Sequence, residues 1–186
     1  MTLTSWSDTF IELDKTYHDR VSFDCGELEL NHFIKTQALK HMKAGISRTM
    51  ILPASSLLPN GKYPICSFYT IAPSSINRNT LPEGIAKKLP HYPIPVFLLA
   101  QLAVHKNEQS NGLGKITLIK ALDYLYEINS RMRAFAIIVD CLNSNAEKFY
   151  LKFGFEHLYS NKDRVRLFIP MKKVAELFSA EKNCPL

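Results

Sequence analysis

The chain has no apolar run of the roughly 18 residues that a membrane-spanning helix requires. Its N-terminus, MTLTSWSDTF, also has no basic stretch followed by an apolar core, which is the pattern of a secretory signal. We therefore expect a cytoplasmic protein that makes no contact with a membrane. Of its 186 residues, 46% are hydrophobic and 22% are charged, which is the composition of a globular protein with one domain over residues 1–186.

Cysteine is scarce, and its spacing does not fit a zinc site. The four cysteines are far apart in the sequence (Cys25, Cys66, Cys141 and Cys184). The histidines show no ligand spacing either. We expect no bound metal, and we interpret the cysteines as buried free thiols in a reducing compartment.

The common nucleotide-binding loops are missing. There is no Gly-x-x-x-x-Gly-Lys-[Ser/Thr], and no Gly-x-Gly-x-x-Gly with an acidic residue after a second strand, which argues against a kinase or a Rossmann domain. Residues 98–155 show a different order of elements. An apolar run at 98–104 precedes a polar loop at 105–111, and Gln-x-x-Gly-x-Gly at 109–114 then opens an amphipathic helix. A second apolar strand is expected at 135–139.

The start of the amphipathic helix has the composition of a phosphate site. Apolar residues recur along the helix at three- and four-residue spacing, which predicts one buried stripe (Leu118, Ala121, Leu122, Leu125 and Ile128). The first amides of any helix lack internal partners and lie at the positive end of its dipole. Gly112 and Gly114 allow a phosphate to approach these amides, and Lys115 adds a charge. The pattern predicts a site for the pyrophosphate of a nucleotide-like cofactor, although Gly-x-Gly alone is also typical of an ordinary helix start.

The remaining sequence predicts a mixed α/β fold. Strands are expected at 10–13, 48–52, 65–71 and 165–169. Helices are expected at 27–43, 81–89, 145–153 and 174–180. Asp24 is placed to cap the first of these helices, and Gly45 to end it. We expect a mostly antiparallel sheet with one parallel pair at the cofactor site.

The order of elements in residues 98–155 resembles the acetyl-CoA site of the GNAT N-acetyltransferases. The phosphate loop of that family is usually [Arg/Gln]-x-x-Gly-x-[Gly/Ala], and residues 109–114 read Gln-Ser-Asn-Gly-Leu-Gly. The resemblance implies the GNAT fold: a central, mostly antiparallel twisted sheet with a splayed parallel pair at the acetyl-CoA site, flanked by helices. It also implies that acetyl-CoA is held by strand amides, by the loop and by an asparagine. These expected contacts are Leu102, Val104, Gln109, Ser110, Asn111, Gly112, Leu113, Gly114, Lys115 and Asn143.

A narrower resemblance covers residues 23–155. Phe-Asp-Cys-Gly at 23–26, Leu-Ala-Val at 102–104 and Phe-Tyr-Leu-Lys-Phe-Gly-Phe at 149–155 are together similar to the GNAT toxins of type II toxin–antitoxin systems. Such toxins acetylate the α-amino group of aminoacyl-tRNA, block translation and are paired with a ribbon-helix-helix antitoxin. The resemblance implies the same for this chain, with a homodimer possible. A longer loop at 53–64, and Lys115 where arginine is more usual, leave the identity of the acceptor open.

Acetyl transfer from a thioester needs a neutral amine, donors for the oxyanion and an acid for the leaving thiolate. Tyr150 is the expected acid, with a packed aromatic ring as the alternative interpretation. Backbone amides near Leu102 are expected to hold the oxyanion. We expect His105 and Glu108 to be solvated, so no general base stands out. An α-amino group with a pKa of about 7.7–8.0 needs little help from a base, whereas a lysine side chain needs more.

Positive charge is concentrated in the middle of the chain. Residues 30–107 hold nine basic side chains and one acidic one, whereas residues 1–29 hold two basic and seven acidic ones. This excess favours a polyanionic partner such as tRNA, unless the lysines are simply scattered over a solvated surface. The residues expected to bind RNA are Lys35, Lys40, Lys43, Arg78, Lys87 and Lys88. Two other functions stay open: a GNAT acetyltransferase for a small amine or a protein amine, and a catalytically inactive GNAT-like binding protein.

Overall fold

The computed structural model describes residues 5–161 and 164–182. The chain divides into two compact units, Met1–Ala72 with Ala100–Ala121, and Pro73–Leu99 with Leu122–Leu186. The single domain expected over residues 1–186 stays a prediction. Three of the cysteines are buried and unpaired, as expected (Cys25, Cys66 and Cys141), whereas Cys184 lies outside the described residues.

In the first unit, apolar β-formers build an antiparallel sheet. Strand β1 (Ile11–Glu12) pairs with β3 (Arg48–Pro53), and β3 pairs with β4 (Tyr63–Ile76). The sequence predicts each of these strands, although β4 is longer than expected. A further strand, β2 (His18–Asp19), pairs in parallel with β4. The sequence does not predict β2, because a strand of two residues has no readable alternation.

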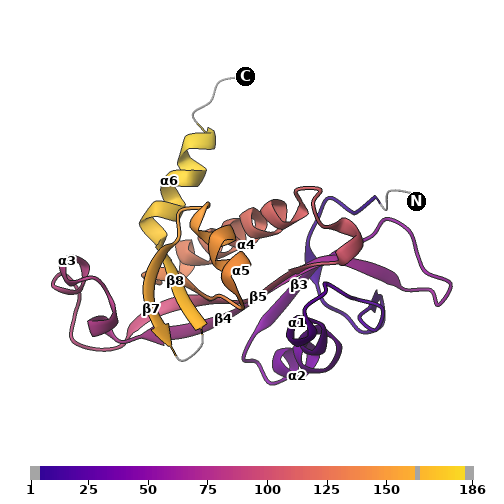
Figure 1. Ribbon diagram of the computed structural model, residues 1–186, viewed down its shortest axis with the longest axis horizontal. Coiled ribbons are helices and arrows are strands. Elements are labelled where there is room, and N and C mark those ends of the chain that lie inside the picture. The colour runs from indigo at the N-terminus through magenta and orange to yellow at the C-terminus, as the bar shows by residue number, and fades with distance from the viewer. Residues whose placement is uncertain (1–4, 162–163, 183–186) are drawn as a thin grey trace. The chain divides into compact units, whose positions relative to one another are not determined.

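The helix expected at 27–43 forms, but it contains a wider turn. Helix α1 (Leu28–His32) continues through a π-helical segment (Phe33–Gln37) into α2 (Ala38–Lys43). The Arg20 guanidinium donates to the carbonyl oxygen of Lys35 within this segment, at 2.7 Å. The expected cap is wrong: α1 begins after Glu27 without a side-chain cap, and the Asp24 carboxylate binds other groups instead. Figure 1 shows α1 and α2 together on one side of β3.

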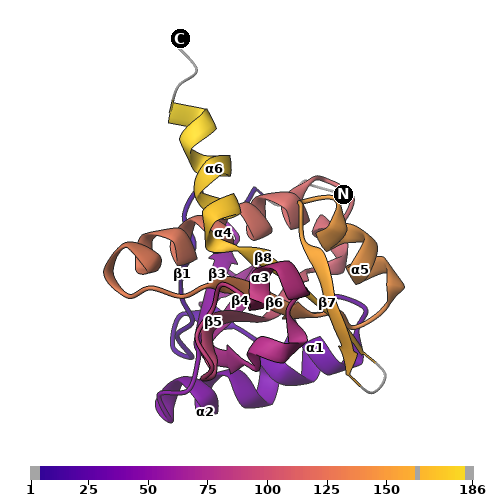
Figure 2. The ribbon, with the colours of Figure 1, turned by 90° about the vertical axis from the view of Figure 1, so that its left-hand side faces the viewer.

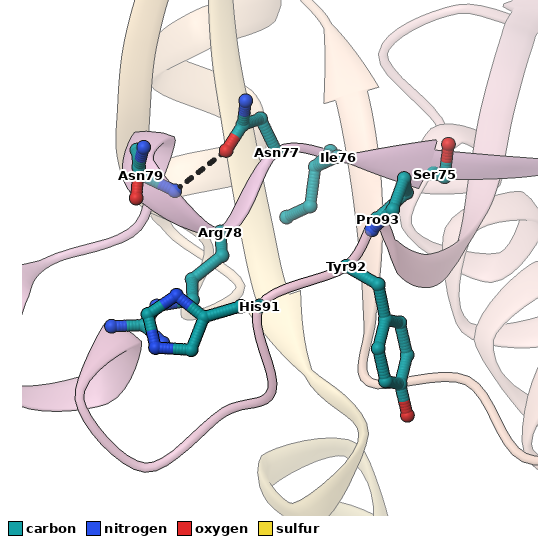
Figure 3. A pocket seen from close by; sticks show the side chains of 8 residues that line it. All are labelled: Ser75, Ile76, Asn77, Arg78, Asn79, His91, Tyr92 and Pro93. Atoms are coloured by element: carbon teal, nitrogen blue, oxygen red, sulfur yellow. Dashed lines mark hydrogen bonds between the residues drawn. The ribbon is translucent and has the colours of Figure 1, made fainter.

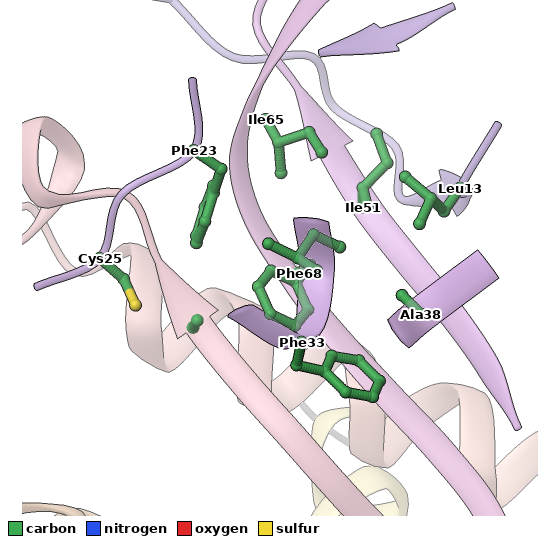
Figure 4. Packing of buried hydrophobic residues seen from close by; sticks show 10 residues of the cluster. Leu13, Phe23, Cys25, Phe33, Ala38, Ile51, Ile65 and Phe68 are labelled. Carbon is green, nitrogen blue, oxygen red and sulfur yellow. The ribbon is translucent and has the colours of Figure 1, made fainter. Parts of the chain in front are cut away.

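The core of the first unit lies between this helical segment and the strands (Figure 4). Phe68 of β4 is fully buried at its centre. The Phe23 ring meets it edge to face at 5.3 Å between centroids, and the Phe33 ring stacks on it at 6.4 Å. Aromatic pairs in these geometries contribute beyond the area that they bury. Phe23 therefore fixes the residues that follow it, 24–26, against the sheet.

The second unit contains the parallel pair. Strand β5 (Ile94–Val104) pairs in parallel with β6 (Ala136–Asp140) at Phe97 opposite Ile137 and Leu98 opposite Ile138. Strand β8 (Arg164–Pro170) pairs antiparallel with β6 on one side and with β7 (Glu156–Asn161) on the other. In Figure 2, these strands lie side by side. The sequence predicts β6 and β8, but not the polar strand β7.

The strand order is β1-β3-β4-β5-β6-β8-β7, and β4 and β5 each run through both units. The long helix α4 (Leu113–Arg131) forms as predicted, with four of the five expected stripe residues buried (Leu118, Ala121, Leu122 and Leu125). Helices α5 (Ser144–Leu151) and α6 (Met171–Lys182) also form. The expected helix at 81–89 is only one turn, α3 (Glu83–Ala86), because prolines lie on both sides of it. The predicted fold, a mostly antiparallel sheet with a parallel pair and flanking helices, is confirmed.

Candidate active site

The first amides of α4, which follow the loop, have no hydrogen-bond acceptor within the helix. The first bond of the helix runs from the Ile116 N–H to the Gly112 carbonyl oxygen, at 3.2 Å. The amides of residues 113–115 therefore have no intrahelical acceptor. Gly112 has a φ of +78°, and a Cβ added there would meet no atom within 4 Å. Ser110 also has a positive φ, of 67°. The Lys115 side chain is exposed in the first turn.

The end of β5 presents amides on the edge away from β4. The His105 N–H donates to the Cys66 carbonyl oxygen of β4 at 2.8 Å. Since successive residues of a strand point their amides to opposite edges, the amides of Leu102 and Val104 point away from β4. These are the two strand amides that the family resemblance gives as contacts of acetyl-CoA. The direction of the backbone thus places both amides on the edge of β5 that faces away from β4, where they can donate to a ligand.

Gln109 ties the loop to the strand and to the segment after Phe23. Its side-chain nitrogen donates to the Val104 carbonyl oxygen and to the Cys25 carbonyl oxygen, at 2.9 Å each. The Gln109 side-chain nitrogen is therefore engaged with the protein. The resemblance gave Gln109 as a contact of acetyl-CoA without indicating these two bonds.

Asp24 is a second anchor for the loop. Its carboxylate accepts hydrogen bonds from the Lys106 ammonium at 2.8 Å, from the Gly26 N–H at 2.9 Å and from the Asn31 side chain at 2.8 Å. The Lys106 N–H also donates to the Asp24 carbonyl oxygen at 2.8 Å. The Lys106 side chain, followed by the other two donors, holds the pKa of this carboxyl well below its usual range. Asp24 thus joins residues 24–31 to the start of the phosphate loop.

Two residues of the loop are less exposed than expected. Glu108 retains only 5% of its exposure, which contradicts the expected solvated side chain. The reason is a 3-10 turn at Lys106–Glu108, closed by the Glu108 N–H donating to the His105 carbonyl oxygen at 2.8 Å, which directs Glu108 inward. The His105 ring packs against Phe23 at 5.7 Å, and its partial burial lowers the pKa of the imidazole.

Tyr150 lies on α5 in the second unit and is 8% exposed. Its ring packs against Phe149 at 5.2 Å and Phe155 at 5.3 Å between centroids. Burial raises the pKa of the phenol well above its ordinary value, with a smaller contribution from Cys141. Asn143, an expected contact of acetyl-CoA, caps α5: its side-chain oxygen accepts from the amides of Asn145 and Ala146 at 3.1 and 3.0 Å. The Asn143 cap therefore helps to position the helix that carries Tyr150.

The expected RNA-binding residues fall into two sets. In the first unit, Lys40 and Lys43 are exposed on α2, and Lys35 is partly buried. In the second unit, Lys88 is exposed, whereas Lys87 pairs with Glu83 at 2.6 Å. Arg78 donates through Nη1 to the Leu89 carbonyl oxygen at 3.0 Å.

Among residues 5–161 and 164–182, no helix has both the length and the apolar character needed to cross a membrane. Within the same described ranges, no three or more His, Cys, Asp or Glu side chains gather in a way that would hold a metal ion.

The comparisons with known proteins agree on one family. Residues 84–155 match the acetyltransferase (GNAT) family. The chain is 31% identical to the tRNA-acetylating toxin of Mycobacterium tuberculosis over 159 residues, which is 86% of this chain and 90% of that protein.

Solved structures show the same similarity over nearly the whole chain. AtaT complexed with acetyl-methionyl-tRNAfMet is 29% identical, with a TM-score of 0.80, covering 91% of this chain and 98% of that chain. AtaTR bound with acetyl-CoA is also 29% identical, with a TM-score of 0.78, covering 91% and 97%. The chain therefore belongs to the GNAT acetyltransferases, and the family resemblance predicted from its sequence is confirmed.

Proposed function

We propose that this protein transfers the acetyl group of acetyl-CoA to the α-amino group of aminoacyl-tRNA and thereby acts as a toxin that blocks translation. The observation that carries this proposal is the similarity to a tRNA-acetylating toxin, which extends over 86% of the chain. The local geometry supports it, because the loop and the strand edge that the family uses for its coenzyme are both present.

The loop and the end of β5 have the donors that a coenzyme with a pyrophosphate requires. We propose that the amides of Leu113, Gly114 and Lys115 bind the pyrophosphate and that the Lys115 ammonium adds charge. Loop residues 109–112 would contact the same phosphates. The amides of Leu102 and Val104 would bind the pantetheine arm and the carbonyl oxygen that becomes negative during transfer. Asn143 stays a proposed contact beside its role as a cap.

Tyr150 is the proposed general acid. When bound, acetyl-CoA supplies an acetyl group activated as a thioester. A phenol with a raised pKa keeps its proton at the pH of the cell, so Tyr150 holds a proton for the departing sulfur. Desolvation would also raise the pKa of the thiol that leaves, so its thiolate would accept a proton from this phenol more readily than in water.

No dedicated base is required for the proposed acceptor. An α-amino group has a pKa of about 7.7–8.0, so a large fraction is neutral near that pH. Among the described residues, the carboxylate nearest to the loop in sequence, Glu108, is buried at 5% exposure. A lysine side chain, with a pKa of about 10.4, would be a poorer acceptor here.

We further propose the cellular setting that the family resemblance implies. The toxin would act in the cytoplasm, where charged tRNA is used, and a ribbon-helix-helix antitoxin would neutralise it. Co-expression with the product of an adjacent ribbon-helix-helix gene should restore the growth of cells that this protein arrests. Growth arrest that this antitoxin fails to relieve would count against the pairing. The possible homodimer stays a prediction.

The direct test uses purified protein, radiolabelled acetyl-CoA and a mixture of charged and uncharged tRNA. Label should appear only on charged tRNA, and mild alkali should release it as an N-acetyl amino acid. Label on a polyamine or on a ribosomal protein, with none on charged tRNA, would identify a small-amine or protein acetyltransferase. Binding of acetyl-CoA without transfer to any amine would identify an inactive GNAT-like protein.

A further inference from the structure

We infer that the pocket between the end of β4 and the start of β5 binds one unpaired nucleotide of the acceptor RNA. The inference rests on the proposed function, since it names the part of the RNA that this segment recognises. The pocket has a volume of about 370 Å³, within the range of small-ligand sites. Two segments form it: residues 75–79, which lead out of β4, and residues 91–93, which lead into β5 (Figure 3).

Arg78 supplies a fixed cation in this pocket. Its Nη1 donates to the Leu89 carbonyl oxygen at 3.0 Å, which fixes the orientation of the guanidinium. Its Nε is buried and has no hydrogen-bond acceptor among the described residues. Buried donors without a partner are rare in proteins and call for an explanation. Nε and Nη2 form the edge of a guanidinium that can receive two oxygens of a phosphate, so a phosphate oxygen is the kind of acceptor that Nε lacks.

Tyr92 and His91 supply aromatic rings on which a base can stack. Tyr92 is 62% exposed, and His91 is exposed beside it in the sequence. Neither side chain makes a hydrogen bond within residues 5–161 and 164–182. Proteins stack unpaired bases on exposed aromatic rings and neutralise the backbone with cations, and the lining of this pocket contains both kinds of group.

The charge of the segment also favours RNA. Its one acidic side chain, Glu83, is paired with Lys87 at 2.6 Å, which leaves Arg78 and Lys88 as its uncompensated charges. Asn77 and Asn79 add amide groups at the rim, although the Asn77 side-chain oxygen already accepts from the Asn79 N–H at 3.0 Å. A duplex presents no free base face to such a pocket, so an unpaired nucleotide is the occupant. In aminoacyl-tRNA, the amino acid is attached to an unpaired end.

A nucleotide in this pocket has two sources within the proposed reaction: the RNA acceptor, and the adenosine part of acetyl-CoA. The test therefore measures both ligands. Fluorescence anisotropy gives the affinity for a hairpin RNA with a 3′-ACCA overhang and for the same hairpin with a blunt end. Calorimetry gives the affinity for acetyl-CoA.

The decisive variant is Tyr92→Ala, with Tyr92→Phe as the conservative change. Tyr17→Ala is the matched control, because Tyr17 is 61% exposed but lies in the acidic N-terminal segment. Loss of a base stacked on an aromatic ring should weaken binding of the overhang hairpin by about 5- to 150-fold in Tyr92→Ala. The blunt hairpin and acetyl-CoA should bind as before, and Tyr92→Phe and Tyr17→Ala should resemble the wild type.

Each other outcome overturns the inference in a distinct way. Equal losses on both hairpins would make Tyr92 a general contact and not a stacking platform. Weaker binding of acetyl-CoA in Tyr92→Ala would assign the pocket to the coenzyme. If Tyr92→Ala binds the overhang normally while the wild type still acetylates charged tRNA, only the pocket assignment fails. If the wild type binds neither hairpin and labels no tRNA, the proposed function fails with it.

Discussion

Replacing Tyr150 with phenylalanine separates the acid from the packing that surrounds it. The ring is 8% exposed and touches Phe149 and Phe155, and phenylalanine keeps both contacts. Among the described residues, the hydroxyl has no hydrogen-bond partner. Its removal should therefore change the free energy of unfolding by less than about 1 kcal/mol. For a chain of this length, the melting temperature should then shift by less than about 4 °C.

The effect on catalysis should be much larger. General acid catalysis contributes about 10²- to 10⁴-fold, which corresponds to about 3–5 kcal/mol of transition-state stabilisation. In Tyr150→Phe, kcat should fall within this range, while the affinity for acetyl-CoA stays within a factor of a few. Steady-state kinetics with charged tRNA, calorimetry with acetyl-CoA and a thermal melt are the three measurements. Phe149→Leu, which alters the neighbouring ring and keeps the hydroxyl, is the control for local repacking.

The pH dependence provides a second check on the same group. Burial raises the pKa of Tyr150 above its ordinary value of 10, so its hydroxyl keeps its proton below pH 10. Deprotonation of Tyr150 should therefore not lower the rate at any pH below 10. Because the folded phenol resists ionisation, the stability that it contributes is fully present below pH 10 and declines at higher pH. Turnover of Tyr150→Phe close to the wild type, with an unchanged melting temperature, would refute the assignment of Tyr150 as the acid.

Three further changes test the phosphate loop, its anchor and the charged surface. Gly114→Glu places bulk and negative charge at the helix start and should abolish acetyl-CoA binding, measured by calorimetry on the folded variant. Asp24→Asn removes the charge that holds Lys106 and should raise the KM for acetyl-CoA more than it lowers kcat. Because the pKa of Asp24 is lowered on folding, its contribution to stability is lost as the pH falls below 3.8. The melting temperature of Asp24→Asn should therefore fall less than that of the wild type as the pH is lowered through this range. Charge reversal at Lys40 and Lys43 should weaken binding to every tRNA, and the slope of log affinity against log salt should flatten by about 0.7–0.9 for each phosphate that the variant no longer neutralises.

Two of these changes have a control within the chain. Gly112→Ala adds only a methyl group in open space, with a conformational cost of about 1–2 kcal/mol, so it should bind acetyl-CoA better than Gly114→Glu does. Glu83→Gln removes an exposed ion pair in the other unit and should leave the KM for acetyl-CoA unchanged. Equal affinities of the two glycine variants for acetyl-CoA would contradict the phosphate-loop assignment. Equal KM values of the two carboxylate variants would contradict the role of Asp24 as an anchor. Unchanged tRNA binding after charge reversal would contradict the charged surface.

Local chemistry explains which parts of the fold the sequence predicts. Helix α4 has a regular apolar stripe and a glycine start, and β6 is a continuous run of β-formers, so both are recognisable within a short window. Strand β7, with the sequence EHLYSN, is polar and is a strand because it pairs with β8. The π-helical segment at Phe33–Gln37 has no local signal at all, and Arg20, which binds one of its carbonyl oxygens, is 15 residues distant from Lys35 in the sequence.

The same distinction holds at the candidate site. The glycines of the phosphate loop and Tyr150 belong to short patterns, and the sequence identifies them. The two anchors of the loop do not, since the Gln109 bond to Cys25 spans 84 residues and the Lys106 bond to Asp24 spans 82. Asp24 was expected to cap a helix because a carboxylate before a helix usually does so. Only the folded chain brings the Lys106 ammonium to it.

These long-range bonds give a physical reason for Phe-Asp-Cys-Gly at residues 23–26. Phe23 packs on Phe68 and on the ring of His105, so it places the segment beside the start of the loop. Asp24 then binds Lys106, and the Cys25 carbonyl oxygen accepts from Gln109. Gly26 has a φ of +88°, a conformation that favours glycine, and its amide donates to Asp24. Residues 23–26 thus hold the polar loop 105–111 at Lys106 and at Gln109. A chain with Gln-x-x-Gly-x-Gly but without this segment would have the amides for a pyrophosphate but would lack these two anchors. Changes at residues 23–26 should therefore alter the KM for acetyl-CoA through the position of the loop.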